Sequence, residues 1–164
     1  MRGLTGAPAR ALAPALGLMA AQALVGLALG YAWLRLAPRP QAYWTGYTWY
    51  SPEVTGFGAA QDVLFGALTV LPGLAAGVCL VLWAARPWAA VRTLLVLVGA
   101  AVGSGATWLV GALASHAWAG GWAVGDTVTA PVNLTSPGVA LLWPVLAALV
   151  PALVLSIRAL VTDK

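Results

Sequence analysis

Four long apolar runs dominate the sequence, and each is long enough to cross a lipid bilayer. They lie at about 11–34, 63–85, 93–115 and 138–160. A helix needs about 20 apolar residues to span the hydrocarbon core, so we expect four membrane-spanning helices. Charged residues make up only 7% of the chain, whereas a soluble domain has roughly 25%. The sequence therefore predicts an all-α, integral membrane four-helix bundle.

The whole chain, residues 1–164, is expected to form a single transmembrane domain, because no polar linker separates two folding units. Its first run follows Arg2 and Arg10, as a secretory signal would. The apolar core of such a signal is only about 7 to 15 residues long, whereas this run continues as far as Tyr31 and Trp33. We therefore interpret the run as an uncleaved anchor.

The positions of lysine and arginine predict which way the bundle faces. Six of the eight fall on one side of the expected membrane: Arg2, Arg10, Arg86, Arg92, Arg158 and Lys164. Arg35 and Arg39 fall on the other side, where the acidic residues Glu53, Asp62 and Asp126 accompany them. Cytoplasmic loops carry an excess of positive residues, so we expect both termini in the cytoplasm and two aromatic-rich loops outside a plasma membrane. A surplus this small, spread over loops, predicts no nucleic-acid partner.

Three glycine pairs predict where the helices approach one another. The pairs are Gly26 with Gly30, Gly73 with Gly77, and Gly99 with Gly103. A spacing of four places both members of a pair on one helix face, and small residues allow membrane helices to pack closely. Packing inside the bundle is the favoured interpretation. Homo-oligomerisation through one of these faces is the alternative.

Prolines inside the second and fourth runs predict bent helices. They are Pro72, Pro144 and Pro151. Each removes a backbone hydrogen bond and bends its helix locally. Proline is also common in membrane helices that only pack, and this is the favoured interpretation. The alternative is a transport site between the two bent spans.

The polar residues expected near the outer boundary form the only candidate polar site, which consists of Asp62, His116, Asp126 and Glu53. The simpler interpretation of Asp62 is a carboxylate in the first turn of a helix, where it complements the helix dipole. No spacing among these residues specifies a reaction, so we predict no catalytic residue, no metal, no cofactor and no enzymatic activity. The lone cysteine, Cys79, cannot form an internal disulfide.

Aromatic residues crowd the first expected outer loop: Tyr43, Trp44, Tyr47, Trp49 and Tyr50. Tyrosine and tryptophan favour the headgroup layer, and Trp33, Trp118 and Trp122 are expected at the same level. An interfacial aromatic belt is therefore the first interpretation. Because these residues also favour strands, the alternative is an extended segment or short hairpin that contacts a partner protein, a lipid headgroup or a glycan.

Two segments resemble a known family. The first is Gly56-Phe57-Gly58-Ala59-Ala60-Gln61-Asp62, followed by a glycine-rich span and Trp83-Ala84-Ala85-Arg86-Pro87-Trp88. The second is Leu141-Leu142-Trp143-Pro144, which is followed by an apolar helix and resembles the last span of that family. Together they resemble an actinobacterial family of short four-helix membrane proteins of unknown function, over about the last two-thirds of the chain. The resemblance implies location and topology and supplies no activity.

These observations favour a non-enzymatic accessory or scaffold subunit. It would pack against a larger membrane complex or against itself, with membrane lipids as its other contacts. The alternative is a small transporter or envelope-lipid-handling protein. Its cavity would open outward between the second and fourth spans, lined by Asp62 or His116.

Overall fold

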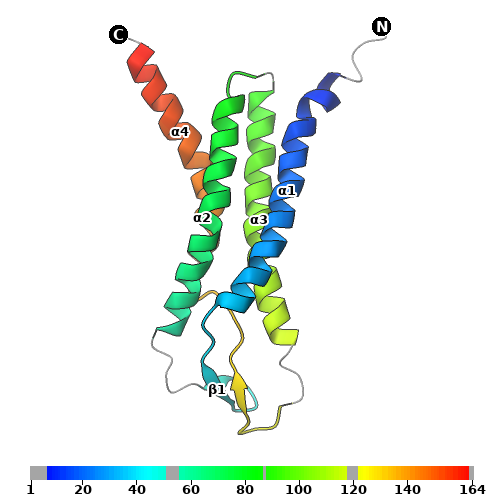
Figure 1. Ribbon diagram of the computed structural model, residues 1–164, viewed down its shortest axis with the longest axis vertical. Coiled ribbons are helices and arrows are strands. Elements are labelled where there is room, and N and C mark those ends of the chain that lie inside the picture. Colours follow the sequence, from blue (N-terminus) through cyan, green and yellow to red (C-terminus); the bar gives the residue numbers. More distant parts are fainter. Residues whose placement is uncertain (1–6, 51–55, 87, 118–121, 163–164) are drawn as a thin grey trace.

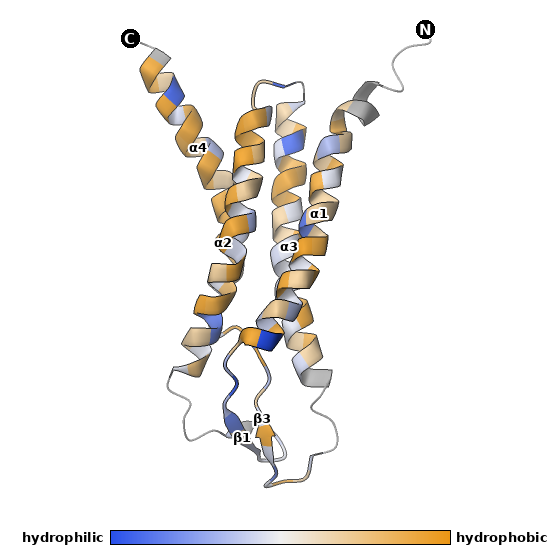
Figure 2. Cartoon of the chain, viewed as in Figure 1, coloured by the Kyte–Doolittle hydropathy of each residue, from blue (hydrophilic) through white to orange (hydrophobic). Residues whose placement is uncertain are grey.

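Four long helices and a small sheet make up the part of the chain that the computed structural model describes, residues 7–50, 56–86, 88–117 and 122–162 (Figure 1). The elements are α1 (Ala7–Leu36), β1 (Gln41–Trp44), β2 (Trp49–Tyr50), α2 (Phe57–Trp83), α3 (Ala89–Ala117), β3 (Thr127–Thr129), the 3-10 helix η1 (Pro137–Leu141) and α4 (Leu142–Thr162). All four α-helices are long and apolar enough to cross a membrane, α4 together with η1. Figure 2 shows that apolar residues predominate along them.

The helices begin or end several residues from the predicted bounds in places. The largest difference is in the second span, where α2 begins at Phe57 and not near residue 63. The third helix likewise begins at Ala89 and therefore includes Arg92, which was expected in a connecting loop. The four-span prediction itself is confirmed as four apolar helices.

The bundle has two different ends (Figure 1). The start of α1, the end of α4 and the adjoining ends of α2 and α3 lie at one end, which we call the termini end. The strands lie at the other, which we call the sheet end. Each helix reverses the direction of the previous one, so α1 runs parallel to α3, and α2 runs parallel to α4.

The closest helix contacts join these parallel pairs and not the consecutive helices. Contacts are most extensive between α1 and α3 and between α2 and α4. The six motif glycines lie at these two interfaces. Gly26, Gly30, Gly99 and Gly103 lie between α1 and α3, while Gly73 and Gly77 lie between α2 and α4. A Cβ at Gly30 would lie 2.7 Å from the carbonyl oxygen of Thr107, and a Cβ at Gly77 would lie 2.6 Å from the Cβ of Val150. These glycine faces are therefore occupied within one chain.

The first core cluster holds the two pairs together. The buried indole ring of Trp143 lies among Ala76 and Leu80 of α2 and Val96 and Ala100 of α3. Trp143 also approaches Gly103, where a Cβ would lie 2.8 Å from the edge of the indole ring. Residues from three helices thus meet around one aromatic ring.

The second core cluster lies towards the sheet end, around Trp33. The Trp33 ring meets Phe65 edge to face with centroids 5.1 Å apart, and its Nε1–H donates to the backbone oxygen of Gln61 at 3.0 Å. Trp33 is fully buried, so its expected place in an interfacial belt is wrong. Its ring packs the helices together instead. Trp118, the second expected belt residue, lies outside the described residues.

The aromatic segment forms a hairpin at the sheet end. In β1 and β2, Tyr43 pairs with Tyr50 and Trp44 with Trp49, around a turn in which Gly46 has a φ of 92°. β1 also pairs with β3, which makes the order β2-β1-β3. The segment thus forms the short hairpin of the second interpretation, and the sheet joins the segments that follow α1 and α3.

Candidate functional site

Asp62 ties α2 to the segment that leads into α4. Its side chain is only 6% exposed. The carboxylate accepts hydrogen bonds from the backbone N–H of Thr135 at 3.0 Å and of Ser136 at 2.9 Å, and from the Thr135 hydroxyl. Ser136 is the N-cap of η1. Asp62 thus satisfies backbone donors at the start of another helix. It lies in the second turn of α2, so the prediction that it complements its own helix dipole from the first turn is wrong.

Gln61 extends the same network and was missed in the sequence. Its Nε2 donates to the Pro38 oxygen at 2.9 Å, and its Oε1 accepts from the Asn133 N–H at 3.2 Å. Together with the bond from Trp33 to its backbone, Gln61 joins three segments that are distant in the sequence. The one sequence signal for Gln61 is its position next to Asp62 in the segment 56–62, which resembles the actinobacterial family.

The other members of the candidate polar site are not seen to join Asp62. The Asp126 carboxylate is exposed and accepts the backbone N–H of Ala123 at 2.8 Å within its own turn. His116 belongs to α3, but its side chain lies outside what the structure describes, as does Glu53 altogether. Among the described residues, no group of three or more His, Cys, Asp or Glu could hold a metal ion.

The aromatic candidates are mostly exposed. Tyr47 at the hairpin turn is 96% exposed, and Tyr43 and Tyr50 also face outward. Trp44 instead meets Trp122 edge to face, with ring centroids 6.4 Å apart. The side chain of Trp49 lies outside the described part. Three tyrosines therefore form an exposed rim on the hairpin.

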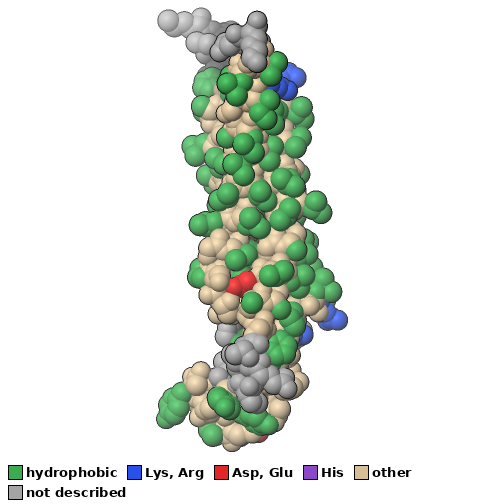
Figure 3. All heavy atoms as spheres, turned by 90° about the vertical axis from the view of Figure 1, so that its left-hand side faces the viewer, with side chains coloured by type: hydrophobic (Ala, Val, Ile, Leu, Met, Phe, Trp, Pro, Cys, Tyr) green, Lys and Arg blue, Asp and Glu red, His purple; other side chains and the backbone are tan. Residues whose placement is uncertain are grey.

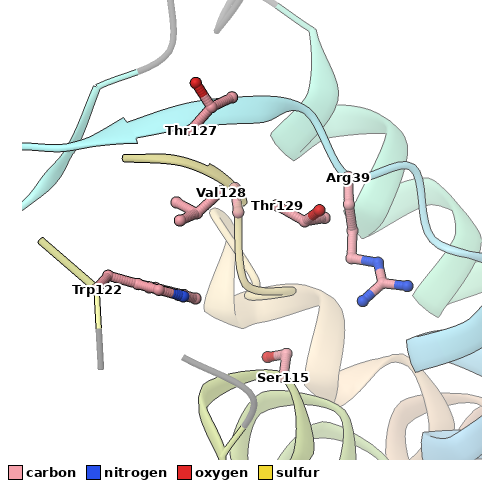
Figure 4. A pocket seen from close by; sticks show the side chains of 7 residues that line it. Arg39, Ser115, Trp122, Thr127, Val128 and Thr129 are labelled. Carbon is pink, nitrogen blue, oxygen red and sulfur yellow. The ribbon is translucent and has the colours of Figure 1, made fainter. Parts of the chain in front are cut away.

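A pocket of about 390 Å³ lies beside the sheet. Figure 4 shows Arg39, Ser115, Trp122 and Thr129 around this space. A guanidinium group, two hydroxyls and an indole ring offer hydrogen bonds to a polar molecule. Arg39 and Trp122 also take part in other interactions within the chain.

A second cavity, of about 220 Å³, lies between the apolar helices α1 and α2. We call it the α1–α2 groove. It is lined by Ala21, Gln22 and Val25 of α1, by Pro72 and Ala75 of α2, and by Trp143 of α4, among others. Gln22 lies near the middle of α1, and Ala75 lies in the second half of α2. The groove is somewhat larger than an engineered cavity of about 150 Å³ that binds benzene.

Two of the residues that line the α1–α2 groove, Gln22 and Trp143, each have a buried polar atom without a partner. Gln22 is 4% exposed and Trp143 is fully buried. Gln22 Nε2 donates to the Val96 oxygen at 3.2 Å, but Gln22 Oε1 and Trp143 Nε1 have no hydrogen-bond partner. Among the described residues, these are the only buried side-chain polar atoms in that state. Leaving a buried polar group unpaired costs roughly 1–3 kcal/mol.

At the sheet end, a pocket of about 240 Å³ lies between the start of α2 and the segment before the fourth span, and Gly58, Gln61 and Thr135 are among the residues that line it. There, Asp62 joins α2 to the start of the fourth span, and further along Gly73 lies against Trp143. The space between α2 and α4 lies at the opposite end of the bundle, where a gap of about 410 Å³ is lined by Val81, Leu82 and Leu155, among others. Gln22 carries no ionisable group, so it did not stand out as a candidate site residue in the first apolar run.

Comparisons with models of protein families, with curated proteins and with solved structures found no match to this chain. The resemblance to an actinobacterial membrane family therefore stays a prediction. Any functional assignment depends on the geometry of the described residues.

Proposed function

We propose that this chain is a non-enzymatic, multi-pass protein of a bacterial plasma membrane that binds an uncharged lipid in the α1–α2 groove. The observation that carries this proposal is an apolar cavity of about 220 Å³ between α1 and α2 that has no charged side chain in its lining. Lipid handling, the alternative in the sequence analysis, thus becomes the leading function. The binding site differs from the outward-facing cavity expected there.

The α1–α2 groove is accessible from the side of the bundle. Ala21, Val25 and Ala75 on its rim are exposed, and α1 and α2 make few contacts with each other. In a membrane this side faces lipid, so a lipid can enter laterally without crossing the headgroup layer. No charged side chain lines the groove, which favours an uncharged ligand, since an unpaired charge there is costly.

A variant that fills the groove tests this function. Ala75→Trp places a large ring in the groove, whereas Ala148→Trp places the same ring on an exposed position of α4 outside it. Native mass spectrometry of protein purified in lipid nanodiscs would measure the bound lipid. We expect the unmodified chain and Ala148→Trp to retain one lipid, and Ala75→Trp to lose it. Equal lipid retention by both variants would contradict the proposal.

A second candidate function, the accessory subunit, is favoured by the far half of α4. Beyond Val150 no described position of α4 is buried, although Leu153, Leu155 and Ile157 lie there. This half leaves α2 towards the termini end (Figure 1), and apolar side chains cover the face that Figure 3 presents. A partner helix in the gap would contact α2 and α4 together, and such packing drives association in lipid.

Photocrosslinking in native membranes tests the accessory role. A photoreactive residue would replace Leu155 in the gap or, as a control, Leu113 on the exposed side of α3. We expect a protein adduct of defined mass from position 155 and none from position 113. Mass spectrometry would tell a second copy of this chain from another membrane protein. Recovery of lipid adducts alone from position 155 would rule out a partner in the gap.

A further inference from the structure

We propose that the pocket beside the sheet binds a phosphate ester that carries hydroxyl groups, such as the polyol headgroup of an anionic phospholipid. This pocket, which we call the sheet pocket, has a volume of about 390 Å³ and lies at the sheet end. It is separate from the α1–α2 groove, because no described residue lines both cavities. The proposal therefore adds a second site to the function proposed above and does not depend on it.

Three segments that are distant in the sequence form the sheet pocket. Arg39 lies between α1 and β1, Ser115 lies in the last turn of α3, and Thr127–Thr129 is β3. The pairing of β1 with β3 fixes the first and third segments relative to each other. The Ala130 N–H, which donates to the Pro40 oxygen at 3.0 Å, continues this pairing next to Arg39. Backbone hydrogen bonds therefore hold the lining in place.

The described side chains of the sheet pocket surround one common space. Figure 4 shows the Arg39 guanidinium on one side of it and the Trp122 indole on the other, with Ser115 and Thr129 between them. Arg39 is the only charged residue among the described lining residues. A guanidinium has several N–H donors in a planar fork that fits a phosphate, so it can hold one alongside its other interaction within the chain. The lining therefore favours an anion.

Ser115 adds a requirement that a bare phosphate does not meet. Figure 4 shows its side chain directed from α3 towards the space. Its hydroxyl donates to the backbone oxygens of Ala112 at 2.8 Å and Val132 at 3.3 Å. Because the proton is engaged there, the Ser115 oxygen accepts hydrogen bonds from the pocket and does not donate into it. The ligand that suits both Arg39 and Ser115 has an anionic group and a hydroxyl that donates.

The size of the sheet pocket also favours a polyol phosphate over phosphate alone. Its volume of about 390 Å³ exceeds that of an engineered cavity of about 150 Å³ that binds benzene. A bare phosphate ion is no larger than benzene and would leave much of the pocket to solvent. The Trp122 ring lines the remaining space and offers an apolar surface that can cover the carbon atoms of a polyol.

The place of the sheet pocket along the bundle suits a lipid headgroup. Ser115 lies in the last turn of α3, a helix long and apolar enough to cross a membrane. The headgroup layer lies just beyond the hydrocarbon core, so the phosphates of a bilayer around these helices would lie at the level of the pocket. Basic pockets between membrane helices are known to bind such headgroups. A free polyol phosphate offers the same chemical groups, and the experiments below distinguish the two sources.

A comparison of lipids on the full chain in nanodiscs tests the proposed chemistry. Each nanodisc contains phosphatidylcholine with a small fraction of phosphatidylglycerol or of phosphatidylmethanol, which has the same charge but no hydroxyl. Native mass spectrometry measures how much of the anionic lipid the protein retains. We expect phosphatidylglycerol to reach half-saturation at an about fivefold lower fraction than phosphatidylmethanol, because only its headgroup donates to Ser115. Equal retention of the two lipids would overturn the proposed ligand class.

Two arginine variants identify the group that holds the phosphate. Arg39→Gln removes the guanidinium from the sheet pocket, and Arg35→Gln removes the same charge from an exposed position near the end of α1 that does not line the pocket. We expect Arg39→Gln to weaken the retention of phosphatidylglycerol about tenfold and Arg35→Gln to change it little. Equal losses would show general attraction to positive charge and overturn the site. If Arg39→Gln does not fold, the comparison of the two lipids on the unmodified chain still decides.

Glycerol phosphate in solution distinguishes a soluble ligand from a lipid headgroup. It is added to the chain in nanodiscs of phosphatidylcholine alone. A glycerol phosphate adduct that Arg39→Gln abolishes would assign the sheet pocket to a free polyol phosphate, whereas retention of phosphatidylglycerol without this adduct would assign it to a headgroup. Absence of both ligands would overturn the site. Ala75→Trp, which fills the α1–α2 groove, should leave both measurements unchanged, so the two proposals can fail separately.

Discussion

At the scale of single residues, the sharpest contrast lies between the two described carboxylates of the candidate polar site. Asp62 is buried and accepts three hydrogen bonds from residues far along the chain. Asp126 is exposed and accepts a hydrogen bond from the backbone N–H of Ala123 within its own turn. The same functional group therefore has a long-range structural role in one place and a local role in the other.

Asp62→Asn is expected to lower the free energy of unfolding by roughly 1–3 kcal/mol, because an amide retains only one accepting oxygen for the three donors. Asp126→Asn serves as the matched control and should cost less than about 1 kcal/mol, since its site is exposed to solvent. Reversible unfolding in mixed detergent micelles would measure both variants. Equal losses would show that Asp62 does not hold the start of η1 as described.

Asp62 and Gln22 show what the sequence alone could not predict. The sequence placed Asp62 near a helix end, but its partners Thr135 and Ser136 belong to a segment whose position depends on the whole fold. Gln22 is a polar residue within an apolar run of the sequence. The groove that it lines is completed by Trp143, which comes from another helix. Burial and the lack of a partner are properties of the packed structure, so no local pattern predicts them.

At the scale of the elements, the glycine pairs predicted close approach but not which helices approach. A glycine pair shows that one helix face carries no bulky side chains, so any other helix can pack closely against that face. In the structure Gly103 meets Gln22 and Trp143, from two different helices. The strand propensity of the aromatic segment indicated an extended conformation, whereas pairing with β3 could not be predicted because Thr127–Thr129 is too short to stand out.

Two glycines of α3 allow a matched test of this packing. A Cβ at Gly103 would lie 2.7 Å from the backbone oxygen of Gln22, whereas a Cβ at Gly105 would meet nothing within 4 Å. We expect Gly103→Ala to lower the unfolding temperature clearly, because α1 would have to move away from α3. Gly105→Ala should leave it unchanged or raise it, since alanine favours a helix over glycine by about 1 kcal/mol. Equal shifts in the two variants would contradict the packing of α1 against α3.

At the scale of the whole molecule, the order of packing explains where the groove arises. Because α1 pairs with α3 and α2 pairs with α4, the consecutive helices α1 and α2 belong to different pairs and touch little. The sheet end closes the molecule through Gln61 and Asp62. Towards the termini end, the Arg92 guanidinium of α3 donates to the backbone oxygen of Ala11 in α1 and lies 5.8 Å from the ring centroid of Trp83 in α2, so it joins the helices there as well. Space therefore remains between the pairs, in the apolar middle of the bundle.

The proposed orientation places the termini end in the cytoplasm and the sheet outside, and two engineered cysteines test it. In a Cys79→Ser background, Tyr47→Cys marks the exposed hairpin turn and Leu160→Cys marks the exposed end of α4. Because loops rich in arginine and lysine stay in the cytoplasm, we expect a membrane-impermeant maleimide to label position 47 and not position 160 on intact cells. Lysed cells should show labelling at both positions, which controls for reactivity. Labelling of position 160 alone on intact cells would contradict the proposed orientation. The termini end would then lie outside the cell, and the exposed tyrosines of the hairpin would face the cytoplasm.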